Sequence, residues 1–113
     1  VNVRKAIASS IDKNFITKAL MGGFAASRIL EVHGERMIKR TFNPGFRIRL
    51  HQKDLNLALQ SARELGVALP ATASAQQLFS AVAATGGADL DHSGMVRALE
   101  TMAAHRVAPD PGG

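Results

Sequence analysis

The stretch LHQKDLNLAL at residues 50–59 decides the fold, because its apolar residues recur at the spacing of a helix rather than alternating as in a strand. One stripe of this helix, continued by the residues that follow, consists of Leu55, Leu59 and Ala62. A second stripe, on another side, consists of Leu50, Lys53 and Leu57. A helix that is apolar on most sides is usually enclosed by its neighbours. The pattern therefore predicts a central helix buried on more than one side.

Lys53 is the exception in this apolar setting, with one leucine a turn before it and another a turn after it. Its amine must either reach water or meet a partner, because a buried unpaired charge is costly. Asp54 projects from another side of the helix, so Arg47 or a neighbouring helix could supply the pairing instead. Two interpretations remain open: Lys53 and Asp54 are structural charges at the edge of a core helix, or Lys53 faces a cleft that receives a polar ligand.

The remainder of the chain also has helical periodicity, and no segment shows the sustained alternation of a strand. Turns and helix ends are expected at Gly22-Gly23, at the motif FNPGF of residues 42–46, at Gly66 and at Gly86-Gly87. Helices are expected to begin near Asp12, Ser27 and Pro70, and the last one at Asp91 or Ser93. The sequence thus predicts an all-α bundle of five or six helices.

The composition narrows the class of protein. With 46% hydrophobic and 20% charged residues, the 113-residue chain suits one globular domain rather than a disordered segment. No apolar run approaches the roughly 18 residues that span a bilayer, so we expect no membrane partner. The absence of cysteine fits a reducing compartment, and we expect a cytoplasmic location.

The net charge of +5 is the sole argument for nucleic-acid binding. Basic residues are interleaved with acidic ones, and the chain has no Tyr or Trp on which bases could stack. This pattern favours an ordinary solvated surface, and we expect no nucleic-acid partner.

No group of residues indicates catalysis or metal binding by itself. The four histidines, His33, His51, His92 and His105, are dispersed along the sequence, and carboxylates do not accompany them at ligand spacing. Asp91 and His92 could form an acid–base pair, but their motif LDHS is more typical of a helix N-terminus. We therefore expect neither a catalytic residue nor a metal site in this chain.

Four motifs occur in order along the sequence: GGFAASRILEVHGERM, FNPGF, HQKDLNLAL and LDHS. In this order they resemble the C-terminal domain of the β-hydroxyacid dehydrogenases, and the resemblance covers the chain from about Ile11 onward. It implies a parent enzyme with an N-terminal Rossmann domain and an all-helical C-terminal domain through which copies associate. It also implies the reversible reduction of tartronate semialdehyde to glycerate, with NAD or NADP as the cofactor.

In this family the lysine of the KDL motif, here Lys53, reaches the cofactor at the interdomain cleft. Asp54 matches the same motif, and the resemblance implies that it belongs to the cofactor site with a positional role. Phe46 and Gly22-Gly23 also match family positions near the cleft. For these residues, a role in the core or at a helix end is at least as suitable. The family's catalytic lysine lies in a glycine-spaced motif that does not occur here, and Lys5 does not fit it. We therefore expect the chain alone to be inactive.

The resemblance also predicts how the chain is divided. Residues 1–10 are expected to end an interdomain helix, residues 11–106 to form the helical domain, and residues 107–113 to be a disordered tail. Because the sequence opens inside a helical pattern, we expect a Rossmann domain to precede it as its main partner. The parent enzyme would act on a small hydroxy or oxo acid and form a homo-oligomer. The alternative is a helical module that self-associates and catalyses nothing.

Overall fold

The computed structural model describes residue 19 and residues 22–110. Its contacts divide the chain into two compact units, residues 1–40 with 107–113, and residues 41–106. The described residues form four α-helices and no β-strand, which confirms the predicted all-α fold. The helix expected over residues 1–10, together with Lys5, lies outside the described residues, and of the helix expected after Asp12 only residue 19 is described, as helical.

The first unit contains helix α3 (Arg28–Lys39), which begins where the sequence predicts. The Oγ atom of Ser27 accepts a hydrogen bond from the backbone N–H of Leu30 at 3.0 Å, as a residue before a helix should. Arg40 ends the helix with a left-handed backbone (φ 55°), and its Nε atom donates to Oδ1 of Asp110 at 2.6 Å. The predicted domain boundaries, and the disorder expected from residue 107, stay predictions.

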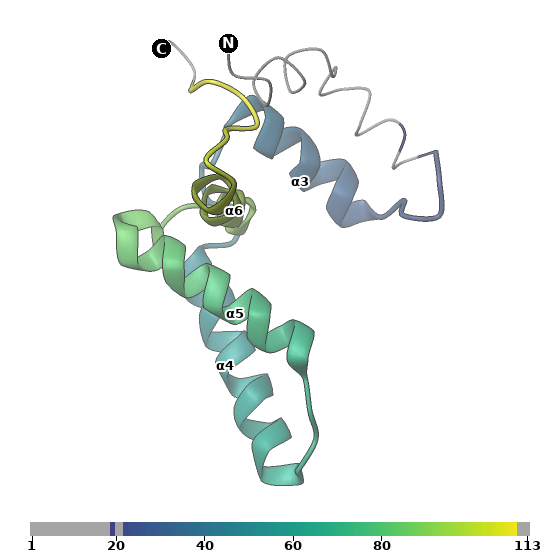
Figure 1. The fold of residues 1–113 in the computed structure, drawn as a ribbon, viewed down its shortest axis with the longest axis vertical. Helices are drawn as coiled ribbons and strands as arrows, with labels where there is room; N and C mark the ends of the chain where they lie inside the picture. The colour runs from purple at the N-terminus through teal and green to yellow at the C-terminus, as the bar shows by residue number, and fades with distance from the viewer. Residues whose placement is uncertain (1–18, 20–21, 111–113) are drawn as a thin grey trace. The chain divides into compact units, whose positions relative to one another are not determined.

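The second unit is built on helices α4 (Ile48–Leu65) and α5 (Pro70–Val82). These two helices lie side by side and run in opposite directions, as Figure 1 shows. The chain continues through a π-helical turn (Ala83–Gly87) and a 3-10 helix (His92–Met95) into α6 (Val96–Ala103). The buried core of this unit consists of Ile48, Phe79, Val82 and Ala98, against which Leu55, Leu78, Leu90 and Met95 pack.

The ends of α4 and α5 confirm the expected stop and start residues. Gly66 ends α4 with φ 69°, a left-handed conformation that glycine adopts without strain, and its N–H reaches the carbonyls of Ala62 and Arg63. Pro70 occupies the first turn of α5, where its missing N–H leaves no intrahelical bond unmade. None of the described helices combines the length and the apolar character needed to cross a membrane.

The prediction that α4 is buried on more than one side is wrong. On one side, Ala62 is buried and Leu55 and Leu59 are half-buried, as expected for the stripe that faces the core. In the second stripe, Leu50 is 41% exposed and Leu57 is 55% exposed. The reason is that α5 and the 3-10 helix pack on the side of α4 that holds Ile48, and within this unit no helix covers the opposite side.

Candidate functional site

The start of α4 is held by a carboxylate that lies far away in the sequence. Asp91 is fully buried, and its Oδ1 atom accepts hydrogen bonds from the backbone N–H groups of Gly45 at 3.0 Å and Phe46 at 3.1 Å. Its Oδ2 atom accepts from the N–H and the hydroxyl of Ser93, at 3.0 Å and 2.6 Å. Asp91 therefore joins the FNPGF turn to the first turn of the 3-10 helix.

These bonds also decide the charge of Asp91. Burial raises the pKa of the carboxyl, but the hydrogen bonds from Ser93, Phe46 and Gly45 outweigh burial and hold the pKa well below its ordinary value. A carboxylate that stays ionised and uses both oxygens for backbone and hydroxyl donors serves a structural role. The interpretation of LDHS as a helix N-terminus is confirmed, with Asp91 as the capping residue.

Main-chain bonds complete the attachment of α4. The N–H of Ile48 donates to the carbonyl of Leu90 at 2.9 Å, and the N–H of Arg49 donates to the carbonyl of Ala88 at 3.0 Å. Helix N–H groups without a partner are costly, and Arg47, which precedes the helix, makes no side-chain cap. Carbonyls from residues 88 and 90 take the place of a cap. The direction of α4, and of every side chain on it, is thereby set by a distant segment.

Lys53 and Asp54 lie one turn into this anchored helix, and both are exposed, with side-chain accessibilities of 66% and 55%. The Nζ atom of Lys53 lies 3.9 Å from Oδ1 of Asp54, which is the outer limit of an ion pair. An exposed pair at this distance is worth roughly 0–1 kcal/mol, so neither charge is needed to stabilise the fold. Arg47 pairs with Asp89 instead, at 3.6 Å.

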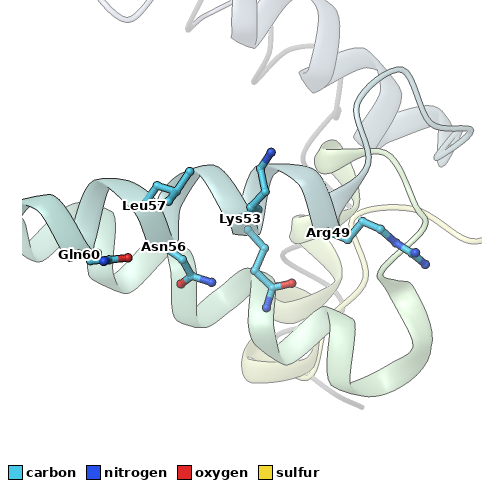
Figure 2. Close-up of a pocket in the computed structure, with 6 residues that line it drawn as sticks. Arg49, Lys53, Asn56, Leu57 and Gln60 are labelled. Atoms are coloured by element: carbon cyan, nitrogen blue, oxygen red, sulfur yellow. The ribbon is translucent and has the colours of Figure 1, made fainter.

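A shallow hollow of about 280 Å³ surrounds Lys53, and every residue that lines it belongs to α4. The lining residues are Arg49, Gln52, Lys53, Asn56, Leu57 and Gln60. Figure 2 shows Lys53 and Leu57 projecting from the same side of the helix, with Asn56 and Gln60 on an adjacent side. Sequence reasoning selected Lys53 but missed Arg49, Asn56 and Gln60, which recur near Lys53 at helical spacing.

A second cluster lies on the buried side of α4 and joins aromatic and imidazole rings. The ring of His51 packs edge-on against Phe79, with centroids 4.8 Å apart, and against Phe46 at 5.8 Å. The centroid of His92 lies 5.4 Å from that of His51, so the fold brings together two histidines that are 41 positions apart in sequence (92 − 51). This cluster packs the start of α4 on α5. Phe46, one of the two family matches outside the KDL motif, lies in this cluster. The other match, Gly22-Gly23, forms an exposed turn in the first unit.

The fold and the candidate site define an all-helical domain whose central helix presents a lysine and several amide donors to solvent. Residues 5–99 match the family described as the NAD-binding domain of NADP-dependent 3-hydroxyisobutyrate dehydrogenase. This match covers most of the chain, and the chain belongs to that family.

Individual relatives agree with this family. The chain is 70% identical over 93 residues to 2-hydroxy-3-oxopropionate reductase of Escherichia coli strain K12. It is 35% identical over 94 residues to a protein of Arabidopsis thaliana named probable 3-hydroxyisobutyrate dehydrogenase-like 1, mitochondrial. It is also 28% identical over 92 residues to glyoxylate/succinic semialdehyde reductase 1 of the same plant. These alignments cover 82%, 83% and 81% of this chain but 32%, 28% and 32% of the relatives. The chain thus spans about a third of their length.

Proposed function

We propose that the chain is the helical domain of a 2-hydroxy-3-oxopropionate reductase, an oxidoreductase that reversibly reduces tartronate semialdehyde to glycerate. The observation that carries this proposal is the 70% identity to the reductase of Escherichia coli, sustained over 82% of the chain. The motifs GGFAASRILEVHGERM, FNPGF, HQKDLNLAL and LDHS, in this order, are part of the same similarity and agree with the proposal. The substrate of the whole enzyme is accordingly a short oxo or hydroxy acid.

Lys53 is the residue that contacts the cofactor, NAD or NADP, in this proposal. Three observations fit an anionic dinucleotide: the amine is exposed, its ion pair with Asp54 is weak, and none of the residues that line its hollow is acidic. Asp54, the next residue of the same KDL motif, has a positional role in this proposal. When bound, the nicotinamide supplies the hydride, and the residues of this chain supply charge and position.

The chain contributes no catalytic residue in this proposal. A Rossmann domain and a lysine in a glycine-spaced motif, neither of which occurs in this sequence, supply nucleotide binding and proton transfer in the whole enzyme. The chain alone is expected to be inactive with NADH and tartronate semialdehyde. The absence of cysteine supports a cytoplasmic location for the enzyme.

The test compares Lys53→Ala with Arg63→Ala in the enzyme that joins this domain to its Rossmann domain. Arg63 is a matched control, because it is an exposed cation of the same helix that does not line the hollow. Lys53→Ala is expected to weaken NADH binding about tenfold, the loss typical of one charge-assisted contact, and to lower turnover of tartronate semialdehyde. Unchanged NADH affinity and turnover in Lys53→Ala would contradict the assignment.

Self-association without catalysis is the second candidate, and exposed apolar side chains favour it. Besides Leu50 and Leu57, Leu99 is 44% exposed and Met102 is 75% exposed on α6. Contiguous exposed apolar patches mark contacts between protein chains, and Leu50 and Leu57 share one side of α4. The homo-oligomer expected for the enzyme would use the same kind of surface. Analytical ultracentrifugation over a wide concentration range tests it, and a monomer at every concentration would contradict self-association of the chain.

A further inference from the structure

A series of polar side chains crosses the contact between α4 and α5. The Nε2 atom of Gln52 in α4 donates a hydrogen bond to Oγ of Ser80 in α5, at 3.0 Å. The same Oγ atom accepts a second bond, also of 3.0 Å, from Nε2 of Gln76. Gln76 is 8% exposed, and its Oε1 atom accepts from Nε2 of Gln77 at 2.9 Å. One hydroxyl thus joins an amide of α4 to a buried amide of α5.

Gln52 lies where the pattern of α4 calls for an apolar residue. It follows Ile48 by four positions and precedes Leu55 by three, and both of these side chains belong to the core of the second unit. Leu59 and Ala62 continue the same stripe at spacings of four and three. Gln52 is therefore the polar member of a stripe that is otherwise apolar, and its side chain is half-buried there.

The main effect of such a polar group is on specificity rather than on stability. Groups that leave water to form a hydrogen bond gain little net stability from it, but a buried polar group without a partner is costly. Leucine, isoleucine and alanine side chains, by contrast, can repack in several arrangements at modest cost. A rotation of α4 that removes Gln52 from Ser80 is thus opposed chiefly by the polar groups. One buried polar residue in the seam between two helices is known to fix their alignment.

The other attachments of α4 act at its ends. Main-chain bonds from Ile48 and Arg49 hold its first residues, and Gly66 ends it. The bond from Gln52 to Ser80 is the one side-chain hydrogen bond between α4 and α5, both of which are fully described. It acts in the second turn of α4, beyond the residues that the main-chain bonds hold.

We infer that Ser80 is a positioning residue, the shared acceptor of a polar bridge (Gln52, Ser80 and Gln76) that selects one rotation of α4 against α5. Gln52 and Lys53 are consecutive, about 100° apart around the helix, so a rotation that displaces one turns the other by the same angle. The polar bridge thereby sets the direction in which Lys53 is presented. The consequence for the cofactor rests on the proposed function, whereas the polar bridge is a property of this chain.

The experiment measures the distance between α4 and α5 with two spin labels. Because the chain has no cysteine, the labels attach only at introduced cysteines. Ala58→Cys and Ala81→Cys provide exposed positions, one on each helix. Pulsed electron paramagnetic resonance then gives the distribution of distances between the labels. A single narrow distribution is expected for the labelled chain, and also after Ser74→Ala, the matched control, which removes an exposed serine of α5.

The decisive variant replaces the whole polar bridge by apolar side chains, Gln52→Leu, Ser80→Ala and Gln76→Leu together. No member of the polar bridge is then left without a partner, and the exposed Gln77 can bond to water, so the fold should be retained. A broad or divided distribution of distances is expected, because the apolar side chains accept more than one rotation. A narrow distribution at the original distance in this variant, folded by circular dichroism, would overturn the inference.

Two single variants decide the matter if the triple variant does not fold. Ser80→Ala removes the shared acceptor and should broaden the distribution, whereas Ser80→Thr retains a hydroxyl and should keep it narrow. A narrow distribution in folded Ser80→Ala would equally contradict the polar bridge.

Kinetics of the enzyme that joins this domain to its Rossmann domain separate the inference from the proposed function. The triple variant should raise KM for NADH by about three- to tenfold, at most the loss expected for Lys53→Ala. A residue that merely stabilises the fold would leave this KM unchanged in a folded variant. If Lys53→Ala raises KM and the triple variant does not, Ser80 does not position Lys53 and the proposed function stands. If neither changes KM while the distances broaden, the cofactor contact is wrong and the polar bridge stands.

Discussion

The Oδ1 atom of Asp91 lies 3.1 Å from the backbone nitrogen of Phe46, although 45 positions separate the two residues in the sequence. Together with the bond to Gly45, this contact holds the turn that leads into α4 against the 3-10 helix. The helix that carries Lys53 is thus oriented by a residue that does not belong to it. The stability of the domain and the geometry of the candidate site depend on the same buried carboxylate.

Replacement of Asp91 by Asn is expected to destabilise the domain by about 2–4 kcal/mol, the range for loss of a buried, fully bonded charge. Both oxygens of Asp91 accept from backbone N–H groups, so the amide nitrogen of Asn would face a donor in either orientation. Urea denaturation followed by circular dichroism measures the change. Asp54→Asn is the control, because Asp54 is exposed and its replacement should alter stability by less than about 0.5 kcal/mol.

The pKa of Asp91 predicts how stability depends on pH. Burial of the carboxyl raises this pKa, but the hydrogen bonds from Ser93, Phe46 and Gly45 lower it by more. The net result is a pKa well below the ordinary value of 3.8. Since the folded state binds this proton less readily than the unfolded state, the contribution is fully present above the unfolded value and is lost as the pH falls below it. Urea midpoints measured from about pH 6 to pH 2 should therefore fall more steeply for the unaltered protein than for Asp91→Asn.

Glu35 is the control for this pH dependence. A hydrogen bond from Lys39 and the charge of that lysine lower the pKa of Glu35, but both side chains are exposed. Exposed pairs contribute little to stability, so Glu35→Gln should keep the steep acid dependence of the unaltered protein. If stability depends only weakly on pH in Glu35→Gln but still falls steeply with acid in Asp91→Asn, then Glu35, and not Asp91, causes the acid sensitivity.

Two apolar residues test which side of the second unit is its core. Phe79 is 4% exposed and packs against the ring of His51, so Phe79→Ala should destabilise the domain by about 3–5 kcal/mol, as for aromatic residues removed from cores. Leu57 is 55% exposed, and Leu57→Ala should change stability by less than about 0.5 kcal/mol. Thermal denaturation of the 113-residue chain compares them. Similar losses for the two variants would mean that Leu57 is buried, as the sequence pattern predicted.

Gly87 is expected to be intolerant of a side chain because of its neighbours. A Cβ atom there would lie 2.5 Å from Cγ1 of Val82, so Gly87→Ala should cost about 1–3 kcal/mol by overpacking. Val82→Ala removes the atom that is too close, and the double variant should be less destabilised than the sum of the two single ones. Gly66→Ala is the contrast. Its φ of 69° is strained for alanine, but no atom lies within 4 Å of the added Cβ. The destabilisation by Gly66→Ala should therefore simply add to that by Val82→Ala. Denaturant titrations of all five variants measure the coupling.

The boundaries of the described helices were predictable because they depend on neighbours in the chain. Ser27 bonds to an N–H three residues away, Gly66 to carbonyls three and four residues away, and Asp91 to an N–H two residues away. These bonds require only a suitable residue at a short, constant separation. Helical periodicity is local in the same sense, and it correctly predicted an all-α fold.

The burial of each apolar stripe was not predictable in this way. Periodicity shows that Leu50 and Leu57 share a side of α4, but burial depends on whether another element covers that side. The approach of His51 to His92 and the bonds from Gly45 and Phe46 to Asp91 likewise join residues far apart in the sequence. For the candidate site, resemblance to a family identified Lys53 and Asp54, whereas Arg49 and Asn56 emerged from the hollow that they line.

The sequence by itself determined that this protein is helical and where most of the described helices begin and end. It also determined which lysine stands out from an apolar helix. These properties depend on interactions within a few residues of the chain. The tertiary structure alone decided that Lys53 is exposed beside a row of hydrogen-bond donors, and that a buried aspartate outside α4 sets the direction of that helix. Those properties depend on which distant segments pack together, and burial, hydrogen bonding and charge are set only when they do.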